Sequence, residues 1–345
     1  MKEVLITGGA GFTGANFASH YLDNGFRVVV FDNLSRKGSL ENLEWLKRNP
    51  NAGNLEFIAG DIRFHPPALK AAVERSDALF HFAAQVAVTT SVTDPRNDFE
   101  TNALGTFNML ELVRTSQGKK PPFFYSSTNK VYGGMEDVAT VEGKDRYSYR
   151  DLPEGIPESR GLDFHSPYGC SKGCADQYVR DYSRIYGLPA VVMRQSCIYG
   201  YRQFGIEDQG WVAWFVIAAV LGKPLTIFGN GKQVRDVLFI EDLIAAYGMA
   251  LASIGKTSGR VYNIGGGPAN TISLLDLLGF LASECSLPVP VTYSDWRPGD
   301  QPVFVSDIRK AKDDFGWAPQ WDWTTGVRKL VEWVRENRRM LESLF

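Results

Sequence analysis

TGGAGFTG, residues 7–14, follows a short apolar run and leads into a helical pattern. Its glycines at 8, 11 and 14 have the spacing GxxGxxG. In a strand-turn-helix unit, the first glycine allows the tight turn, the second lets the backbone approach a pyrophosphate, and the third lets helix and strand pack closely. A flexible turn is the alternative. The strand before the glycines and the helix after them favour a dinucleotide site.

An acidic residue ends the next predicted strand. Asp32 lies 18 residues beyond Gly14, where a carboxylate accepts both hydroxyls of the adenosine ribose and repels a 2′-phosphate. We therefore expect NAD in preference to NADP. Arg36 keeps NADP open, because arginine accommodates that phosphate, although a solvated loop charge is the simpler interpretation. Asp61 and Ile62 follow the third predicted strand and are candidates for the adenine, with an ordinary turn as the alternative.

Strand and helix patterns alternate through the first half of the chain, as a parallel sheet with crossover helices requires. Six nearly continuous apolar runs are typical of strands covered on both faces: residues 4–7, 28–32, 55–59, 79–83, 123–127 and 191–194. The sequence therefore predicts an α/β fold, a doubly wound parallel sheet of the Rossmann type.

The alternation loosens after about residue 195, where Pro/Gly-rich joints indicate a smaller C-terminal α/β domain for the substrate. We expect residues 1–195, with 236–266 returning to them, to form the cofactor domain. Residues 196–235 and 267–345 then form the second domain. The polar stretch 134–164 is too long for a simple connection, and loops of that kind are usually lids or binding loops.

Composition excludes several classes of protein. The 345 residues carry 37 basic and 39 acidic side chains, a net charge of -2, so no overall field favours nucleic acid or an anionic membrane. The longest apolar run, 211–221, has 11 residues, against about 20 for a membrane-spanning helix. No signal peptide precedes the first strand, which predicts a cytoplasmic protein. The four cysteines and four histidines show no metal-ligand spacing, so we expect no catalytic metal.

A second motif, SPYGCSK at 166–172, predicts a helix start with Ser166 as N-cap and Pro167 at the first helical position. Tyr168 and Lys172 then share one helical face, with the ammonium near the phenol or near the same ribose. Lowering a tyrosine pKa from about 10 to near 7 takes roughly 4 kcal/mol, which Lys172 and a positive nicotinamide ring can supply. The resulting phenolate removes a hydroxyl proton while hydride leaves the same carbon. An ordinary amphipathic helix is the alternative.

Residues 124–133 end the fifth predicted strand at the carboxyl edge, where doubly wound folds place ligands. Thr128 is the candidate for a hydrogen bond to the reacting sugar oxygen, with a turn threonine as the alternative. Asn129 and Lys130 follow it, where an enzyme that eliminates water needs an added carboxylic acid and base. Elimination is therefore disfavoured.

At these residues the chain resembles the extended short-chain dehydrogenase/reductase family, the nucleotide-sugar epimerases and dehydratases, over essentially its whole length. The motifs match in order and spacing: TGGAGFTG, FDNLS, GDI, HFAAQ, NALGT, SSTNKVYG and YGCSK. Four stretches resemble members that invert C2 of a CDP-hexose: SSTNKVYGG, LDFHSPYGCSKGCADQY, RQFGIEDQGWVAWF and GNGKQVRDVLFIEDL.

The resemblance implies specific roles for individual residues. Tyr168 is the base, Lys172 orients the nicotinamide ribose, and Thr128 contacts the sugar hydroxyl. The cofactor-binding set comprises Gly8, Gly11, Phe12, Thr13, Gly14, Asp32, Asn33, Ser35, Arg36, Asp61, Ile62, Ala83, Ala84, Gln85, Asn102, Ser126, Tyr168 and Lys172. The substrate-binding set comprises Thr128, Asn129, His165, Cys197, Gln209, Arg235 and Arg297.

The alternatives for the substrate residues stay open. Arg235 and Arg297 are expected to bind the diphosphate, because the fork-shaped donors of arginine suit it. The alternative is that they form ion pairs with Asp236 or Asp300. Cys197 stands where many C4 epimerases carry asparagine. His165 contacts the sugar or packs in the loop.

The implied activity is inversion of C2 of a CDP-hexose (CDP-paratose/CDP-tyvelose or CDP-glucose/CDP-mannose) through a 2-keto sugar, with tightly held NAD+. The partners are this nucleotide-diphosphate sugar and further copies of the chain, as a dimer or tetramer. Two alternatives remain: another nucleotide-sugar enzyme, such as a C4 epimerase or reductase, and a non-catalytic NAD sensor. The sensor would lack Tyr168 or Lys172, and both are present.

Overall fold

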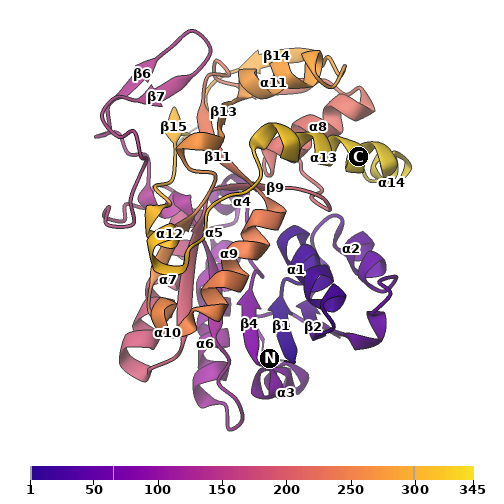
Figure 1. The fold of residues 1–345 in the computed structure, drawn as a ribbon, viewed down its shortest axis with the longest axis vertical. Helices are drawn as coiled ribbons and strands as arrows, with labels where there is room; N and C mark the ends of the chain where they lie inside the picture. The colour runs from indigo at the N-terminus through magenta and orange to yellow at the C-terminus, as the bar shows by residue number, and fades with distance from the viewer. Residues whose placement is uncertain (1, 65, 298–299) are drawn as a thin grey trace.

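The computed structural model describes residues 2–64, 66–297 and 300–345 and confirms the predicted doubly wound sheet (Figure 1). Seven parallel strands lie in the order β12-β8-β5-β4-β1-β2-β3. Their bounds are β1 (Glu3–Thr7), β2 (Arg27–Asp32), β3 (Leu55–Ala59), β4 (Ala78–His81), β5 (Phe123–Thr128), β8 (Ala190–Gln195) and β12 (Val261–Ile264). The order reverses between β1 and β4, so the carboxyl ends of these strands border a crevice suited to a ligand.

Helices cover both faces of this sheet, because successive strand residues point to opposite sides. Val4 and Ile6 of β1 belong to a core with Phe17 and Tyr247, from helices α1 (Phe12–Asp23) and α9 (Ile240–Ala252). Leu5 belongs to the core on the other face. That face is covered by α3 (Pro67–Arg75), α6 (Gly105–Thr115) and α7 (Pro167–Tyr186). The near-continuous apolar runs in the sequence thus reflect burial on both sides.

Strand β4 ends two residues before the predicted bound of 83. At Phe82 and Ala83 the chain crosses the glycine turn, and a Cβ on Gly8 would lie 2.5 Å from the Ala83 backbone nitrogen. The Phe82 N–H still bonds to the Thr7 carbonyl oxygen at 3.0 Å. The close approach to the turn, and not the apolar pattern, sets the end of this strand.

The remaining strands form smaller sheets beside the first (Figure 1). One contains β9 (Cys197–Tyr199), β11 (Val234–Phe239), β13 (Thr271–Ser273) and β15 (Val303–Phe304), and another pairs β10 (Leu225–Phe228) with β14 (Val291–Ser294). The main helices here are α8 (Trp211–Leu221), α11 (Leu274–Ser283), α13 (Trp323–Glu336) and α14 (Arg338–Leu344). Of the strands in the predicted returning segment, β12 joins the large sheet, whereas β11 joins the small sheet. The division of the chain into two domains remains our proposal.

Segment 134–164 contains a hairpin, β6 (Thr140–Glu142) and β7 (Tyr147–Tyr149), that is bonded to the second group of strands. The Tyr147 N–H donates to the Lys232 carbonyl at 3.0 Å, and the Ile156 N–H donates to the Val305 carbonyl at 2.8 Å. The segment is thus a strap over the small sheet.

Short elements complete the chain: α2 (Ser39–Leu46), α4 (Val88–Thr93), α5 (Pro95–Phe99), α10 (Ile254–Thr257), α12 (Arg309–Phe315), the 3-10 turns η1 (Ala52–Asn54), η3 (Asn129–Tyr132) and η4 (Pro268–Asn270), and the π-helix η2 (Glu100–Leu104). Within the described ranges, none of the helices has the length and apolar character needed to cross a membrane.

Candidate active site

A cavity of about 530 Å³ lies at the carboxyl ends of the large sheet's strands. It brings together most of the residues predicted for cofactor and catalysis. Those that line it are Gly8, Gly11, Phe12, Thr13, Gly14, Asp32, Asn33, Ser35, Arg36, Asp61, Ile62, Ala83, Ala84, Gln85, Ser126, Thr128, Tyr168, Lys172 and Gln209. A cavity of this size suits a small organic ligand.

The glycine turn has the shape that a dinucleotide requires. A Cβ on Gly14 would lie 2.2 Å from the Gly8 carbonyl oxygen, so only glycine lets α1 start this close to β1. Gly11 is the N-cap of α1, without a side-chain cap and without acidic residues in the first turn. The first N–H groups of the helix are therefore left to an anionic ligand. The residues present fit the pyrophosphate of NAD.

Two carboxylates lie where the adenosine half of NAD is expected. Asp32 accepts hydrogen bonds from the N–H groups of Ala10 at 3.0 Å and Leu34 at 2.8 Å, which aim it into the cavity. Asp61 is held by the Arg63 guanidinium at 2.8 Å and by the Asn33 amide at 3.1 Å. Arg36 is an exposed residue that lines the cavity and donates to the Gln209 side-chain oxygen at 2.7 Å.

Helix α7 starts as predicted and positions the catalytic pair. The Ser166 hydroxyl accepts from the Gly169 N–H at 3.0 Å, with Pro167 at the first helical position. Tyr168 and Lys172 are both buried and line the cavity. The Lys172 ammonium donates to the Ser126 carbonyl at 2.5 Å and lies 4.4 Å from the centre of the Tyr125 ring. It therefore faces β5.

Burial dominates the electrostatics of this pair. Burial, with a smaller contribution from the Asp98 charge, raises the pKa of the Tyr168 phenol to about 12, against the opposing effects of the Thr128 hydroxyl and the Arg36 charge. Burial lowers the pKa of the Lys172 ammonium to about 7, against the opposing charges of Asp98 and Asp176. Lys172 makes its hydrogen bond to the Ser126 carbonyl. That Lys172 and a positive nicotinamide ring together lower the pKa of the phenol stays a prediction.

A second cluster adjoins Thr128. Asn129 is buried beside it and receives a weak hydrogen bond from the Thr128 hydroxyl at 3.3 Å. Burial lowers the pKa of Lys130, and the nearby Arg235 lowers it further, with Asp300 and Cys197 opposing. Arg235 pairs with Asp300 at 2.6 Å. Asn129, Cys197 and Arg235 thus gather next to Thr128, outside the residues that line the cavity.

Three predicted residues lie elsewhere. Asn102 is buried behind the cavity wall, where its amide bonds to both the N–H and the carbonyl of Gln85. His165 lies directly after the strap, between Asp163 at 3.0 Å and Glu136 at 3.4 Å. Arg297 pairs with Asp208 at 3.0 Å and stacks on the Phe228 ring at 4.0 Å, so its partner is neither Asp236 nor Asp300.

Sequence reasoning missed part of the cavity wall. Gln195, the last residue of β8, and Ser196, directly after it, line the cavity next to β5. Their position at the carboxyl end of a predicted strand is a signal that could have identified them. The other missed lining residues are Phe31, Lys37, Ser39, Asn42, Gly60, Arg63, Phe82, Val86, Thr90, Asn97, Thr101, Ser127, Ile198, Arg202, Gln203 and Phe204. The described residues contain no group of three or more histidine, cysteine or acidic side chains arranged to hold a metal ion.

The sequence matches a known protein family over most of its length. Residues 5–330 match the model of the GDP-mannose 4,6 dehydratase family. The chain belongs to this family. One relative is CDP-paratose 2-epimerase of Salmonella typhi, which is 49% identical over 96% of this chain and 99% of that protein. The predicted relationship to the nucleotide-sugar epimerases and dehydratases of the extended short-chain dehydrogenase/reductase family is confirmed.

Solved structures of family members share the fold. The UDP-glucose 4-epimerase of Thermotoga maritima, solved with UDP-glucose, superimposes with a TM-score of 0.81 at 31% identity, over 97% of this chain and 99% of that one. The UDP-glucuronic acid 4-epimerase of Bacillus cereus, solved with UDP-glucuronic acid and NAD, gives 0.82 at 26% identity over the same shares. The predictions of NAD as cofactor and of a nucleotide-sugar enzyme are confirmed.

Proposed function

We propose that the protein is an NAD-dependent 2-epimerase of a CDP-hexose. The observation that carries the proposal is the 49% identity, over nearly the full length of both chains, to CDP-paratose 2-epimerase. Thr128, Tyr168 and Lys172 together at one cavity support it, because alcohol oxidation needs a proton acceptor beside a hydride acceptor. Asn129 and Lys130, where a dehydratase needs an acid and a base, argue against elimination despite the family's name.

Each residue then has a defined task. Gly8, Gly11 and Gly14 hold the pyrophosphate of NAD, and Asp32 binds the adenosine ribose. When bound, NAD+ supplies a hydride acceptor for the sugar carbon and a positive charge beside the phenol. Tyr168 removes the C2 hydroxyl proton. It returns the proton after the 2-keto sugar has rotated in the site and presents its other face.

The supporting residues follow the same scheme. Thr128 holds the reacting oxygen, and Lys172 positions the cofactor ribose. The cluster around Lys130 and Arg235 lies next to Thr128, where a nucleotide diphosphate is expected to extend from the sugar. This assignment of substrate residues is part of the proposal.

The test is a panel of CDP-, UDP- and dTDP-hexoses incubated with the purified protein and followed by proton NMR. Inversion at C2 of a CDP-hexose supports the proposal. Inversion at C4, loss of water, or consumption of added NADH with net reduction would each replace it. We also propose that the chain acts as a homo-oligomer, for which exposed apolar side chains on helices α4, α5 and α7 and on η2 provide the surface.

A further inference from the structure

A buried carboxylate that the proposed mechanism does not use lies behind the catalytic helix. Asp98, on α5, has no exposed surface. Its oxygens accept hydrogen bonds from the Ser171 hydroxyl at 2.5 Å and the Asn102 amide at 3.1 Å, both of which are neutral donors. No ion pair joins Asp98 to any residue that the structure describes. A buried carboxylate without a cation is costly and calls for a compensating charge nearby.

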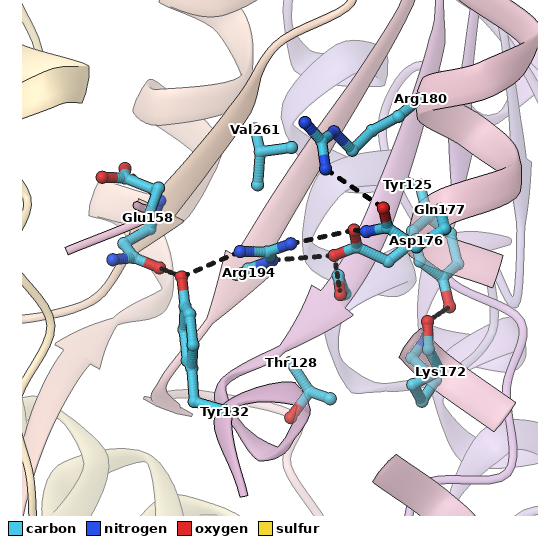
Figure 2. A network of polar contacts seen from close by, with 12 residues as sticks. Tyr125, Thr128, Tyr132, Glu158, Lys172, Asp176, Gln177, Arg180, Arg194 and Val261 are labelled. Atoms are coloured by element: carbon cyan, nitrogen blue, oxygen red, sulfur yellow. Dashed lines mark hydrogen bonds and ion pairs between the residues drawn. The ribbon is translucent and has the colours of Figure 1, made fainter. Parts of the chain in front are cut away.

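Asp176, on the catalytic helix α7, shows the contrasting arrangement (Figure 2). Its carboxylate receives two bonds from the Arg194 guanidinium, at 2.9 and 3.0 Å, and one from the Ser127 hydroxyl at 2.9 Å. Arg194 also donates to the Tyr132 hydroxyl at 3.1 Å. The charge of Asp176 is therefore largely balanced by its own partner.

The groups around Lys172 come from four elements. Asp176 lies on α7 itself and is balanced by Arg194. Strand β5 contributes the Tyr125 ring and the Ser126 carbonyl, both uncharged. Strand β4 contributes His81, which is neutral because burial lowers its pKa to about 3. Helix α5 contributes Asp98, the carboxylate among these groups that lacks a cation of its own.

Local geometry joins Asp98 to the catalytic pair. Ser171 stands between Tyr168 and Lys172 on α7, and its hydroxyl is the contact to Asp98. Asn102 bridges Asp98, Ser171 and the cavity residue Gln85. Asn102 also lies in the π-helix η2, a conformation often found at functional sites. These contacts fix the carboxylate against the catalytic helix, beside the residue that precedes Lys172.

We propose that Asp98 is a positioning residue whose buried carboxylate, fixed through Ser171, keeps the Lys172 side chain in its ammonium form and ready to hold the cofactor ribose. The role assigned to Lys172 rests on the proposed function, but its charge state does not. Asp98 raises the pKa of Lys172 against the effect of burial. Removing the carboxylate charge should therefore let Lys172 lose its proton at a lower pH.

Asp98→Asn is the direct variant because it removes the charge and keeps the shape. The asparagine oxygen can accept from Asn102, and its amide can donate to Ser171, whose hydroxyl then turns to the Tyr168 carbonyl at 3.2 Å. Asp94→Asn is the matched control. It makes the same change at the exposed N-cap of α5, where asparagine caps equally well.

The experiment titrates Lys172 by NMR in protein labelled with ¹³C at lysine Cε, with the signal assigned by its loss in Lys172→Arg. We expect the midpoint to fall by about one pH unit in Asp98→Asn and to stay unchanged in Asp94→Asn. An unchanged midpoint in Asp98→Asn overturns the proposal. No substrate is needed, so the result is independent of whether the protein epimerises any sugar.

Asp98→Glu guards against failure of Asp98→Asn to fold. It keeps the charge but shifts the carboxylate, so the account predicts a midpoint close to that of the unmodified protein. A midpoint that falls in Asp98→Glu would overturn the proposal. Where epimerisation is measurable, the alkaline limb of its pH profile should move with the Lys172 midpoint, while a merely structural defect would lower the rate equally at all pH values.

Discussion

At the scale of single residues, the proposed chemistry depends on the buried phenol of Tyr168. Tyr168 is 9% exposed, and burial raises its pKa to about 12. Bringing that value to near 7 takes about five units, roughly 7 kcal/mol. Thr128 and Arg36 both act in the right direction. The phenol is thus kept protonated by the protein and depends on added positive charge to act as a base.

Tyr168→Phe removes the phenolic oxygen and leaves the ring. We expect epimerisation to fall by about 10²- to 10⁴-fold, since the variant lacks the general base. The variant should still hold NAD, because the glycine turn and Asp32 are untouched. Turnover by NMR and the cofactor content of the purified variant check this. A variant with more than a tenth of the normal rate would remove Tyr168 from the mechanism.

His81 predicts a pH dependence of stability. It is fully buried between the Thr7 hydroxyl at 2.6 Å and the Thr106 hydroxyl at 3.0 Å, and burial lowers its pKa from 6.5 to about 3. The imidazole therefore binds a proton more readily in the unfolded chain than in the folded protein. The stabilising contribution of neutral His81 is fully present above pH 6.5. As pH falls toward 3, the free energy of unfolding declines by about 1.4 kcal/mol per pH unit.

The check is urea unfolding of the unmodified protein and of His81→Asn between pH 7 and 5. The slope of unfolding free energy against pH should be smaller in the variant by roughly the contribution of one proton. Equal slopes in both proteins would show that His81 does not titrate on unfolding.

At the scale of elements, the start of α1 illustrates a close contact that admits no side chain. Gly14→Ala places a Cβ 2.2 Å from the Gly8 carbonyl oxygen, so backbone must move. We expect a loss of about 1–3 kcal/mol in stability and a lower NAD content in the purified protein. Gly53→Ala is the control, since a Cβ there meets nothing within 4 Å. Retention of normal NAD content in Gly14→Ala would contradict the placement of the pyrophosphate.

The Asp176–Arg194 pair ties α7 to β8 in the interior (Figure 2). Its side chains are 0% and 2% exposed. Asp176→Asn leaves the guanidinium buried without its carboxylate, which we expect to cost about 3–5 kcal/mol. Asp151→Asn, in an exposed pair with Arg150, should cost at most about 1 kcal/mol. Denaturant unfolding compares the two, and similar losses would contradict the account of this network.

Elements encoded by local pattern were predictable, and contacts made across the fold were not. The glycine turn and the Ser166-Pro167 start of α7 follow from spacing and capping alone, and the structure confirms both elements. Helix α13 buries Val327 and Leu330 on one face, as helical periodicity indicates. No sequence pattern pointed to Asp98, because the role proposed for it depends on a hydrogen bond to Ser171, 73 positions further along the chain. The hydrogen bond from Lys172 to the Ser126 carbonyl gave no signal either, because it joins two parts of the chain that are distant in sequence.

At the scale of the whole molecule, one surface predicts self-association. Helices α5 and α7 and the adjoining segments expose large apolar side chains: Val92, Phe99, Leu104, Tyr178, Ile185 and Tyr186. We expect a dimer or tetramer in sedimentation experiments, and Tyr178→Glu should shift the protein toward monomer because it buries a charge in that interface. A protein that sediments as a monomer before mutation would contradict the prediction.

The cavity as a whole is built from both parts of the chain. Arg36 after β2 meets Gln209 from the second part, while Asp208 beside it holds Arg297. In the proposed function, a substrate entering here would lie between the predicted cofactor residues and residues of the second part such as Gln209. The central claim is therefore that this one cavity oxidises and re-reduces the same sugar carbon.

The most direct test of that claim is incubation of the purified protein, without added NAD+, with CDP-paratose and with CDP-glucose in D2O, followed by proton NMR of the C2 signals. The account predicts conversion at C2 with the carbon-bound hydrogen retained, because hydride leaves and returns within one closed site. Conversion with deuterium incorporated at C2, or no conversion of either sugar even after NAD+ is added, would contradict it.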